Sequence, residues 1–140
     1  MIAGTAAILI LIVLAGVHAY WAAGGKAGKG AAVPSKNGRP VLMPTPLTTL
    51  LVAAGLFAIT ALLAVRIGWF ALPAFPYQHD LVQVAVWLTA AVFALRAIGD
   101  FRYVGFFKRV RDSRFARLDT IAYSPLCACM ALLVAISAVT

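Results

Sequence analysis

The residues that most clearly suggest a chemical function are Arg96 and Asp100, which are four positions apart. On a continuous helix this spacing puts both side chains on one face, within reach of each other. Their neighbours are mostly apolar, so a helix that continued to Phe107 would hold the pair inside a membrane or at its boundary. Charged side chains at that depth are costly and are usually paired or face a polar cavity. Two interpretations stay open, an anion or headgroup site and a structural ion pair that marks a helix end.

His18 lies one turn before the end of another apolar segment. Its imidazole could carry a proton, act as a ligand or pack as a hydrogen-bonded side chain. A metal site would need further ligands at suitable spacing, and no second His, Cys or carboxylate accompanies His18 in the sequence. The glycine-rich stretch 24–30 lacks the Gly-Lys-Ser/Thr ending of a phosphate-binding loop. We therefore expect neither a metal nor an organic cofactor.

The composition requires a lipid environment around these residues. Of 140 residues, 64% are apolar and 11% are charged, and the mean hydropathy is +0.97. Soluble domains contain about 45–50% apolar and about 25% charged residues. A small soluble domain could not bury this excess, because its surface is large relative to its volume. The net charge of +8 suits anionic lipid or membrane topology, since the apolar blocks leave no room for a nucleic-acid-binding module.

Four apolar segments are long enough to position the polar residues as membrane-spanning helices. A helix that crosses the hydrocarbon needs about 20 residues, and backbone groups cannot stay unpaired in lipid. The sequence therefore predicts an all-α four-helix membrane bundle in one domain, residues 1–140. Thr45-Pro46 and Ser124-Pro125 are typical of a helix N-cap followed by proline in the first turn. The predicted spans are about 2–22, 46–70, 80–99 with an optional continuation to 107, and 122–139.

The basic residues of the connections predict an orientation. The first connection contains four cations and no acid, whereas the third contains six cations and three acids. With four spans these two connections lie on one side, which the positive-inside rule assigns to the cytoplasm. We therefore expect a multi-pass protein of a bacterial inner membrane, with both termini outside. The cations are Lys26, Lys29, Lys36 and Arg39 in the first connection, and Arg102, Lys108, Arg109, Arg111, Arg114 and Arg117 in the third.

Alternating spans would bring most of the reactive side chains together in the cytoplasmic leaflet. The N-termini of the second and fourth helices would point to the same zone, and helix N-termini favour anions. This convergence predicts a site for an anionic or lipid-like ligand. Its expected residues are His18, Tyr20, Arg96, Asp100, Arg102, Tyr103 and Tyr123.

Three stretches of the chain resemble a known family. They are 18–25, which begins His-Ala-Tyr-Trp, the run 96–108 from Arg-Ala-Ile-Gly-Asp to Phe-Phe-Lys, and 118–127, which begins Leu-Asp-Thr. Together they resemble a family of small bacterial membrane proteins catalogued as a domain of unknown function, number three-nine-nine-five. The resemblance covers nearly the whole chain and implies a four-helix membrane protein. It implies no catalytic role for any residue.

Three functions remain open at this point. The first is a binding or accessory protein, forming oligomers, whose partners are membrane lipids, especially anionic ones, and further copies of the chain, but no nucleic acid. The second is a dimeric small-molecule transporter. The third is a membrane-embedded enzyme acting on a lipophilic substrate, with His18 or Asp100 as general base and Tyr103 or Tyr123 as acid.

The orientation can be tested directly. A reporter that is active only in the periplasm, fused after Thr140, should be active, because both basic connections must lie on the opposite side. The same reporter fused after Arg109 should be inactive. Activity of a cytoplasm-dependent reporter at Thr140 would contradict the predicted orientation.

Overall fold

The computed structural model describes residues 1–36, 39–41, 43–73 and 75–140 of the chain. Four helices in it are long and apolar enough to cross a membrane, which confirms the predicted all-α membrane fold. The first three are α1 (Ile2–Ala22), α3 (Pro46–Arg66) and α4 (Gln78–Ile98). The fourth runs from Arg114 to Val139 and consists of α5 (Arg114–Leu118), the π-helical turn η1 (Asp119–Tyr123) and α6 (Ser124–Val139).

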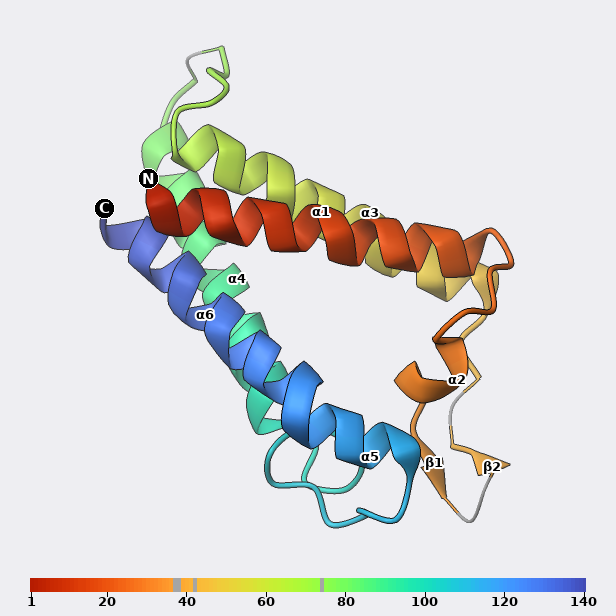
Figure 1. Ribbon diagram of the computed structural model, residues 1–140. Coiled ribbons are helices and arrows are strands. Elements are labelled where there is room, and N and C mark those ends of the chain that lie inside the picture. Colours follow the sequence, from red (N-terminus) through yellow and green to blue (C-terminus); the bar gives the residue numbers. More distant parts are fainter. Residues whose placement is uncertain (37–38, 42, 74) are drawn as a thin grey trace.

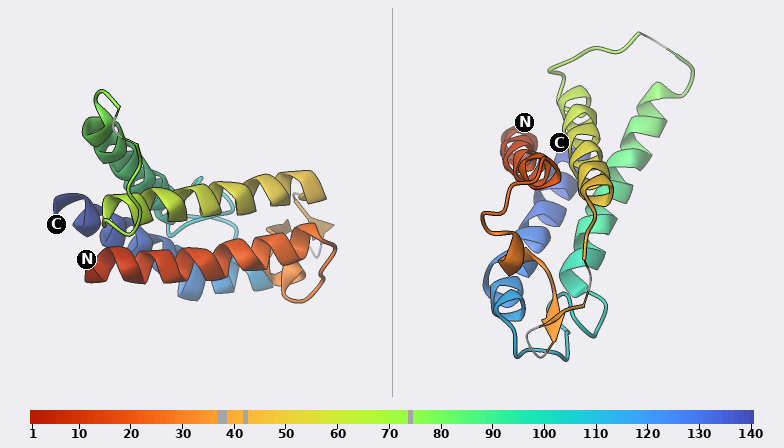
Figure 2. Two further views of the ribbon diagram at one scale, coloured as in Figure 1. Left: turned by 90° about the horizontal axis from the view of Figure 1, so that it is seen from above. Right: turned by 90° about the vertical axis from the view of Figure 1, so that its right-hand side faces the viewer.

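The four helices form two pairs that diverge from one end. Helix α1 packs along α3, and α4 packs along α6. Figures 1 and 2 show the pairs meeting where both chain termini lie and separating toward the other end. We call these the terminal end (Met1, Thr140 and the 67–77 connection) and the open end (the 23–45 and 99–113 connections). The arrangement puts any space between the pairs at the open end.

The core lies in the terminal half of the molecule. Its buried side chains come from all four helices, for example Ile8, Leu63, Val86 and Val134. Gly4 allows close packing there, because a Cβ at this position would lie 2.5 Å from Cγ2 of Ile67. Two side chains also hold the end of α6. Its Ala138 carbonyl oxygen accepts hydrogen bonds from Arg66 Nη2 of α3 at 2.8 Å and from Gln83 Nε2 of α4 at 2.9 Å.

The described parts of the 23–45 connection lie at the open end (Figure 1). It contains the short helix α2 (Lys29–Ala32) and two two-residue strands, β1 (Ser35–Lys36) and β2 (Arg39–Pro40), paired antiparallel. Helix α2 packs against α5 (Figure 1). The predicted N-cap of α3 is confirmed, because Thr45 Oγ1 accepts a hydrogen bond from the Thr48 amide at 3.2 Å.

Helix α4 ends at Ile98, so the predicted continuation to residue 107 is wrong. Gly99 and Gly105 have φ of 92° and 89°, and a Cβ on either would collide with backbone of the other side of the loop. The chain therefore turns back on the helix end. The Phe106 amide donates to the Ala97 carbonyl at 2.9 Å, which satisfies one of the carbonyls left open at the end of a helix.

The fourth helix starts before the predicted Ser124-Pro125 cap. Its N-cap is Ser113, whose Oγ accepts a hydrogen bond from the Ala116 amide at 3.0 Å. Pro125 lies inside the helix, where it has no N–H to donate and its ring crowds the preceding turn. A wider turn accommodates it, because the Ser124 amide donates to the Asp119 carbonyl in the i to i−5 pattern. The Ser124 amide is therefore hydrogen-bonded within the helix and is not free at a helix N-terminus.

Candidate functional site

A buried carboxylate organises the open end. The Asp119 side chain is fully buried at the start of the π-helical turn. Its Oδ1 accepts a hydrogen bond from Arg96 Nη2 at 2.9 Å. Its Oδ2 accepts from the Gly105 amide at 2.8 Å, from Lys108 Nζ at 3.0 Å and from Ser124 Oγ at 3.2 Å. One carboxylate thus joins α4, the 99–113 loop and the fourth helix.

Lys108 is also buried, with 2% of its surface exposed. Its ammonium group has three donors, and each has an acceptor. These are Asp119 Oδ2 at 3.0 Å, the Gly105 carbonyl at 2.9 Å and Thr120 Oγ1 at 2.7 Å. All three donors of the Lys108 ammonium group are therefore used within the protein. Lys108 has a structural role, in which it holds the loop against the fourth helix.

Arg96 pairs with Asp119, so the predicted pairing with Asp100 is wrong. The salt bridge joins residues 23 positions apart, which the i, i+4 spacing in the sequence could not indicate. The Arg96 side chain is 35% exposed, and its Nη1 is buried without a hydrogen-bond acceptor among the described residues. Arg96 and Lys108 together bring two positive charges to the single negative charge of Asp119. The cluster therefore keeps an excess positive charge on the Arg96 side.

Asp100 has a local role in the loop. Its Oδ1 accepts hydrogen bonds from three backbone amides that follow it: Arg102 at 2.9 Å, Tyr103 at 2.7 Å and Val104 at 2.9 Å. Partial burial opposes ionisation of this carboxyl, but the three amides outweigh it and lower the pKa of Asp100 below its ordinary value of 3.8. Asp100 therefore stabilises the turn after α4 and is not a partner of Arg96.

A cavity of ≈ 430 Å³ lies at the terminal end, and a larger one of ≈ 520 Å³ lies between the helix pairs at the open end. Helices α1 and α3 provide one wall of the larger cavity, the 23–45 connection covers a second side, and Arg96 and Phe115 lie on the third. Most of its lining is apolar, while Arg96 and Lys29 are its charged residues. The first turn of α3 also faces it, through Thr45 and Thr48. We refer to this space as the open-end cavity.

The structure brings together only part of the predicted ligand site. His18 and Arg96 line the open-end cavity from opposite helix pairs. His18 Nδ1 lies 2.7 Å from the Leu14 carbonyl oxygen, which fixes that nitrogen as the donor and leaves Nε2 as the acceptor in the neutral ring. Tyr123 lies beside the lining residue Phe115, with ring centroids 6.0 Å apart, and its hydroxyl donates to the Ala31 carbonyl at 3.4 Å.

The other predicted site residues do not line this cavity. Tyr20 is 51% exposed, and its hydroxyl lies 3.5 Å from the Ala27 amide in the following connection. Arg102 stacks on the neighbouring Tyr103 ring, 5.1 Å from its centroid. Asp100 belongs to the loop described above. Asp100, Arg102 and Tyr103 do not share a helix face with Arg96, because α4 does not continue beyond Ile98.

The predicted ligand site did not include three residues that matter here, although sequence reasoning placed Asp119 at the same depth of the membrane. Asp119 and Lys108 form the cluster that holds Arg96, and Lys29 lines the cavity. A signal for Asp119 exists, because it is one of only four acidic residues and adjoins an apolar span. Ionisable residues inside a membrane are usually paired with another polar group. No comparable signal distinguishes Lys108 or Lys29 from the other basic residues.

The Asp119 cluster can be tested by removing its charges singly and together. Asp119→Asn should destabilise the protein by about 3–5 kcal/mol, because Lys108 then stays buried without its counter-charge. The double variant Asp119→Leu, Lys108→Met removes the buried pair and should recover part of this loss. The free energy of unfolding in detergent measures both effects. Equal stability of Asp119→Asn and the wild type would contradict the assignment of a buried ion pair.

The lowered pKa of Asp100 predicts that the stability of the folded protein depends on pH. A carboxyl whose pKa is lowered by folding stabilises the folded state above its ordinary pKa and loses this effect as the pH falls through the folded value. The melting temperature of Asp100→Asn should therefore lie below that of the wild type at neutral pH, and the difference should narrow as the pH falls below 3.8 and through the lower folded pKa of Asp100. A difference that stayed constant over this range would show that the charge of Asp100 does not stabilise the loop.

Comparisons with known proteins identify the family of the chain but give no activity for it. Neither a curated protein nor a solved structure matches the chain. The model of one family, described as protein of unknown function (DUF3995), matches residues 11–134. This range includes the Asp119 cluster, all of α3 and α4, and parts of α1 and α6. The chain therefore belongs to the DUF3995 family, a group of proteins of unknown function.

Proposed function

We propose that this protein is a membrane-embedded binding protein for an amphipathic anion, which it holds in the open-end cavity. The observation that carries the proposal is a largely apolar cavity whose wall contains the guanidinium of Arg96, a side chain that is 35% exposed. If the basic connections face the cytoplasm, as their charge predicts, the ligand enters from the cytoplasmic leaflet.

The charge of the cavity supports an anionic ligand. Asp119 is shared between Arg96 and Lys108, so it cannot neutralise both. Lys108 spends all three donors inside the protein, whereas Arg96 Nη1 has no acceptor among the described residues. Lys29, in α2, adds a second cation to the lining of the cavity. A carboxylate or phosphate that reached Arg96 would gain charge-assisted hydrogen bonds from a planar, fork-shaped donor.

The shape and polarity of the cavity support an amphiphile rather than a free ion. Its volume of ≈ 520 Å³ falls within the range of about 300–1,000 Å³ that is typical of small-molecule sites. Val33, Met43, Val52 and Phe115 give it an apolar lining. The hydroxyls of Thr48 and Thr49 are already bonded to the Thr45 carbonyl at 2.9 Å. The lining therefore offers cationic groups at Arg96 and Lys29 and an otherwise largely apolar space for the hydrocarbon part of a ligand.

The proposal predicts a stabilisation that depends on the headgroup. Dodecyl phosphate should raise the apparent melting temperature of the delipidated protein more than dodecylphosphocholine, which has the same tail but no net charge. A ligand at a hundred times its Kd contributes about 2.7 kcal/mol to the folded state. Val52→Trp should abolish the difference between the two probes, because the indole would fill the cavity from its α3 wall.

A matched control is available on α1. Val13 is 65% exposed and does not line the cavity, so Val13→Trp should keep the full response to dodecyl phosphate. Arg96→Lys keeps the charge opposite Asp119 but loses the fork-shaped donor, and should weaken the response without unfolding the protein. An equal loss in both tryptophan variants, or an unchanged response in Val52→Trp, would overturn the proposal.

A further inference from the structure

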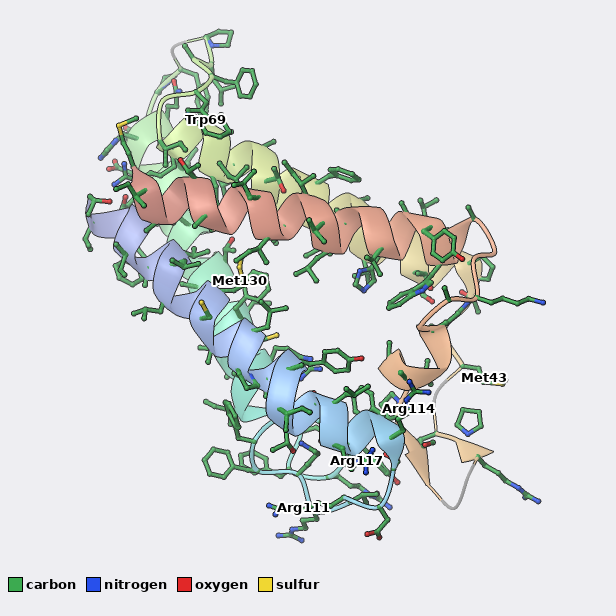
Figure 3. The ribbon with its side chains drawn as sticks, in the orientation of Figure 1. Met43, Trp69, Arg111, Arg114, Arg117 and Met130 are labelled. Atoms are coloured by element: carbon green, nitrogen blue, oxygen red, sulfur yellow. The ribbon has the colours of Figure 1, made fainter. Side chains whose placement is uncertain are left out.

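A second cationic feature lies on another side of α5, away from the open-end cavity. A groove of ≈ 610 Å³ is lined by Arg111, Arg114 and Arg117 together with Leu118, Thr120 and Ile121. Figure 3 shows the three labelled arginines along α5 and the loop that precedes it. We propose that this groove is a site for a membrane lipid whose headgroup carries two phosphates.

The arginines of the groove form no salt bridge among the described residues. The chain contains four acidic residues, all of them Asp. Asp119 is used by Arg96 and Lys108, Asp100 by backbone amides, and Asp80 lies at the start of α4, at the terminal end. The fourth, Asp112, is exposed and lies between Arg111 and Arg114 in the sequence. Within the described parts of the chain no guanidinium of the groove lies at salt-bridge distance from a carboxylate. Three exposed guanidiniums side by side repel one another and favour a bound anion.

The apolar part of the groove favours a lipid over a free phosphate compound. Ile121 follows Arg117 by four residues, which puts the two on neighbouring turns of the helix. Ile121 is 72% exposed, and the helix continues with further exposed apolar side chains, including Leu132 at 61%. A headgroup bound at the arginines would therefore lie at the membrane end of an apolar track that an acyl chain can follow.

The number of arginines favours a headgroup with two negative charges. A single phosphodiester would leave two of the three cations unpaired, whereas two phosphates leave one. Arginine binds phosphate oxygens through two parallel hydrogen bonds, so neighbouring phosphates can each engage a separate guanidinium. The site thus selects by charge number as well as by lipid character.

The test compares three probes on the full-length protein in detergent. The probes are diphosphatidylglycerol with two phosphates, phosphatidylglycerol with one, and inorganic pyrophosphate without a lipid tail. We expect diphosphatidylglycerol to bind most tightly, as measured by native mass spectrometry and by the shift of the melting temperature. The double variant Arg114→Gln, Arg117→Gln should weaken this binding by about 25-fold, since each cation near an anionic lipid surface contributes about fivefold.

The chain provides a control with the same change of charge. Arg102 and Arg109 are exposed on the same loop region but do not line the groove. Arg102→Gln, Arg109→Gln should therefore leave diphosphatidylglycerol binding within about twofold of the wild type. All four residues are exposed, so neither double variant removes a buried contact. Val52→Trp should leave this binding unchanged, which separates the groove from the open-end cavity.

Three outcomes would overturn the proposal. Equal weakening in the two double variants would mean a diffuse surface charge without a defined site. Equal affinity for phosphatidylglycerol and diphosphatidylglycerol would remove the selection for two phosphates. Pyrophosphate binding as tight as that of the two-phosphate lipid would assign the groove to a soluble anion.

Discussion

The open end of the molecule depends on one buried carboxylate. Moving an ion out of water costs several kcal/mol even after the protein relaxes, so Asp119 requires compensation from every side. It receives this from Arg96, Lys108, Ser124 and the Gly105 amide, which belong to three separate segments. Because these partners must converge on one group, the 99–113 loop folds back under α4. The same contacts direct the Arg96 guanidinium, so the chemistry of the cavity wall follows from the demand of Asp119.

The cavity itself follows from an uneven distribution of packing along the helices. Membrane helices associate through close contact of small residues, since lipid tails compete equally well for apolar surfaces. A contact of this kind occurs at the terminal end, where Gly4 meets Ile67. Hydrogen bonds from Arg66 and Gln83 to the Ala138 carbonyl oxygen also join the helices there. The open end has the charged cluster and two polar connections in place of a shared apolar core. The helix pairs therefore separate there, and the 23–45 connection occupies part of the space.

The sequence was sufficient to predict the four spans, because long apolar runs and the lack of alternative backbone partners in lipid leave few choices. It was insufficient for the ion pair, since the prediction assumed a helix through Gly99 and Gly105, and both adopt positive φ. The predicted start of the fourth helix was wrong for a related reason. Pro125 usually indicates a first turn, but here a π-helical turn accommodates it inside the helix. Both errors concern local rules that tertiary contacts of Asp119 override.

The cavity and the arginine groove differ in how their positive charge is held. Arg96 is partly buried and anchored to Asp119, so solvent and salt screen it only weakly, and its orientation is set before a ligand arrives. The groove arginines are exposed, and at physiological salt their attraction for an anion falls off over about 8 Å. A ligand would therefore interact strongly with the groove only in direct contact with the arginines. An acyl chain of the proposed lipid that packs on Ile121 would prolong that contact. Helix α5 thus lies between a cation whose orientation is fixed by an ion pair and a cluster of exposed arginines, so the two proposed sites would select ligands by geometry and by charge, respectively.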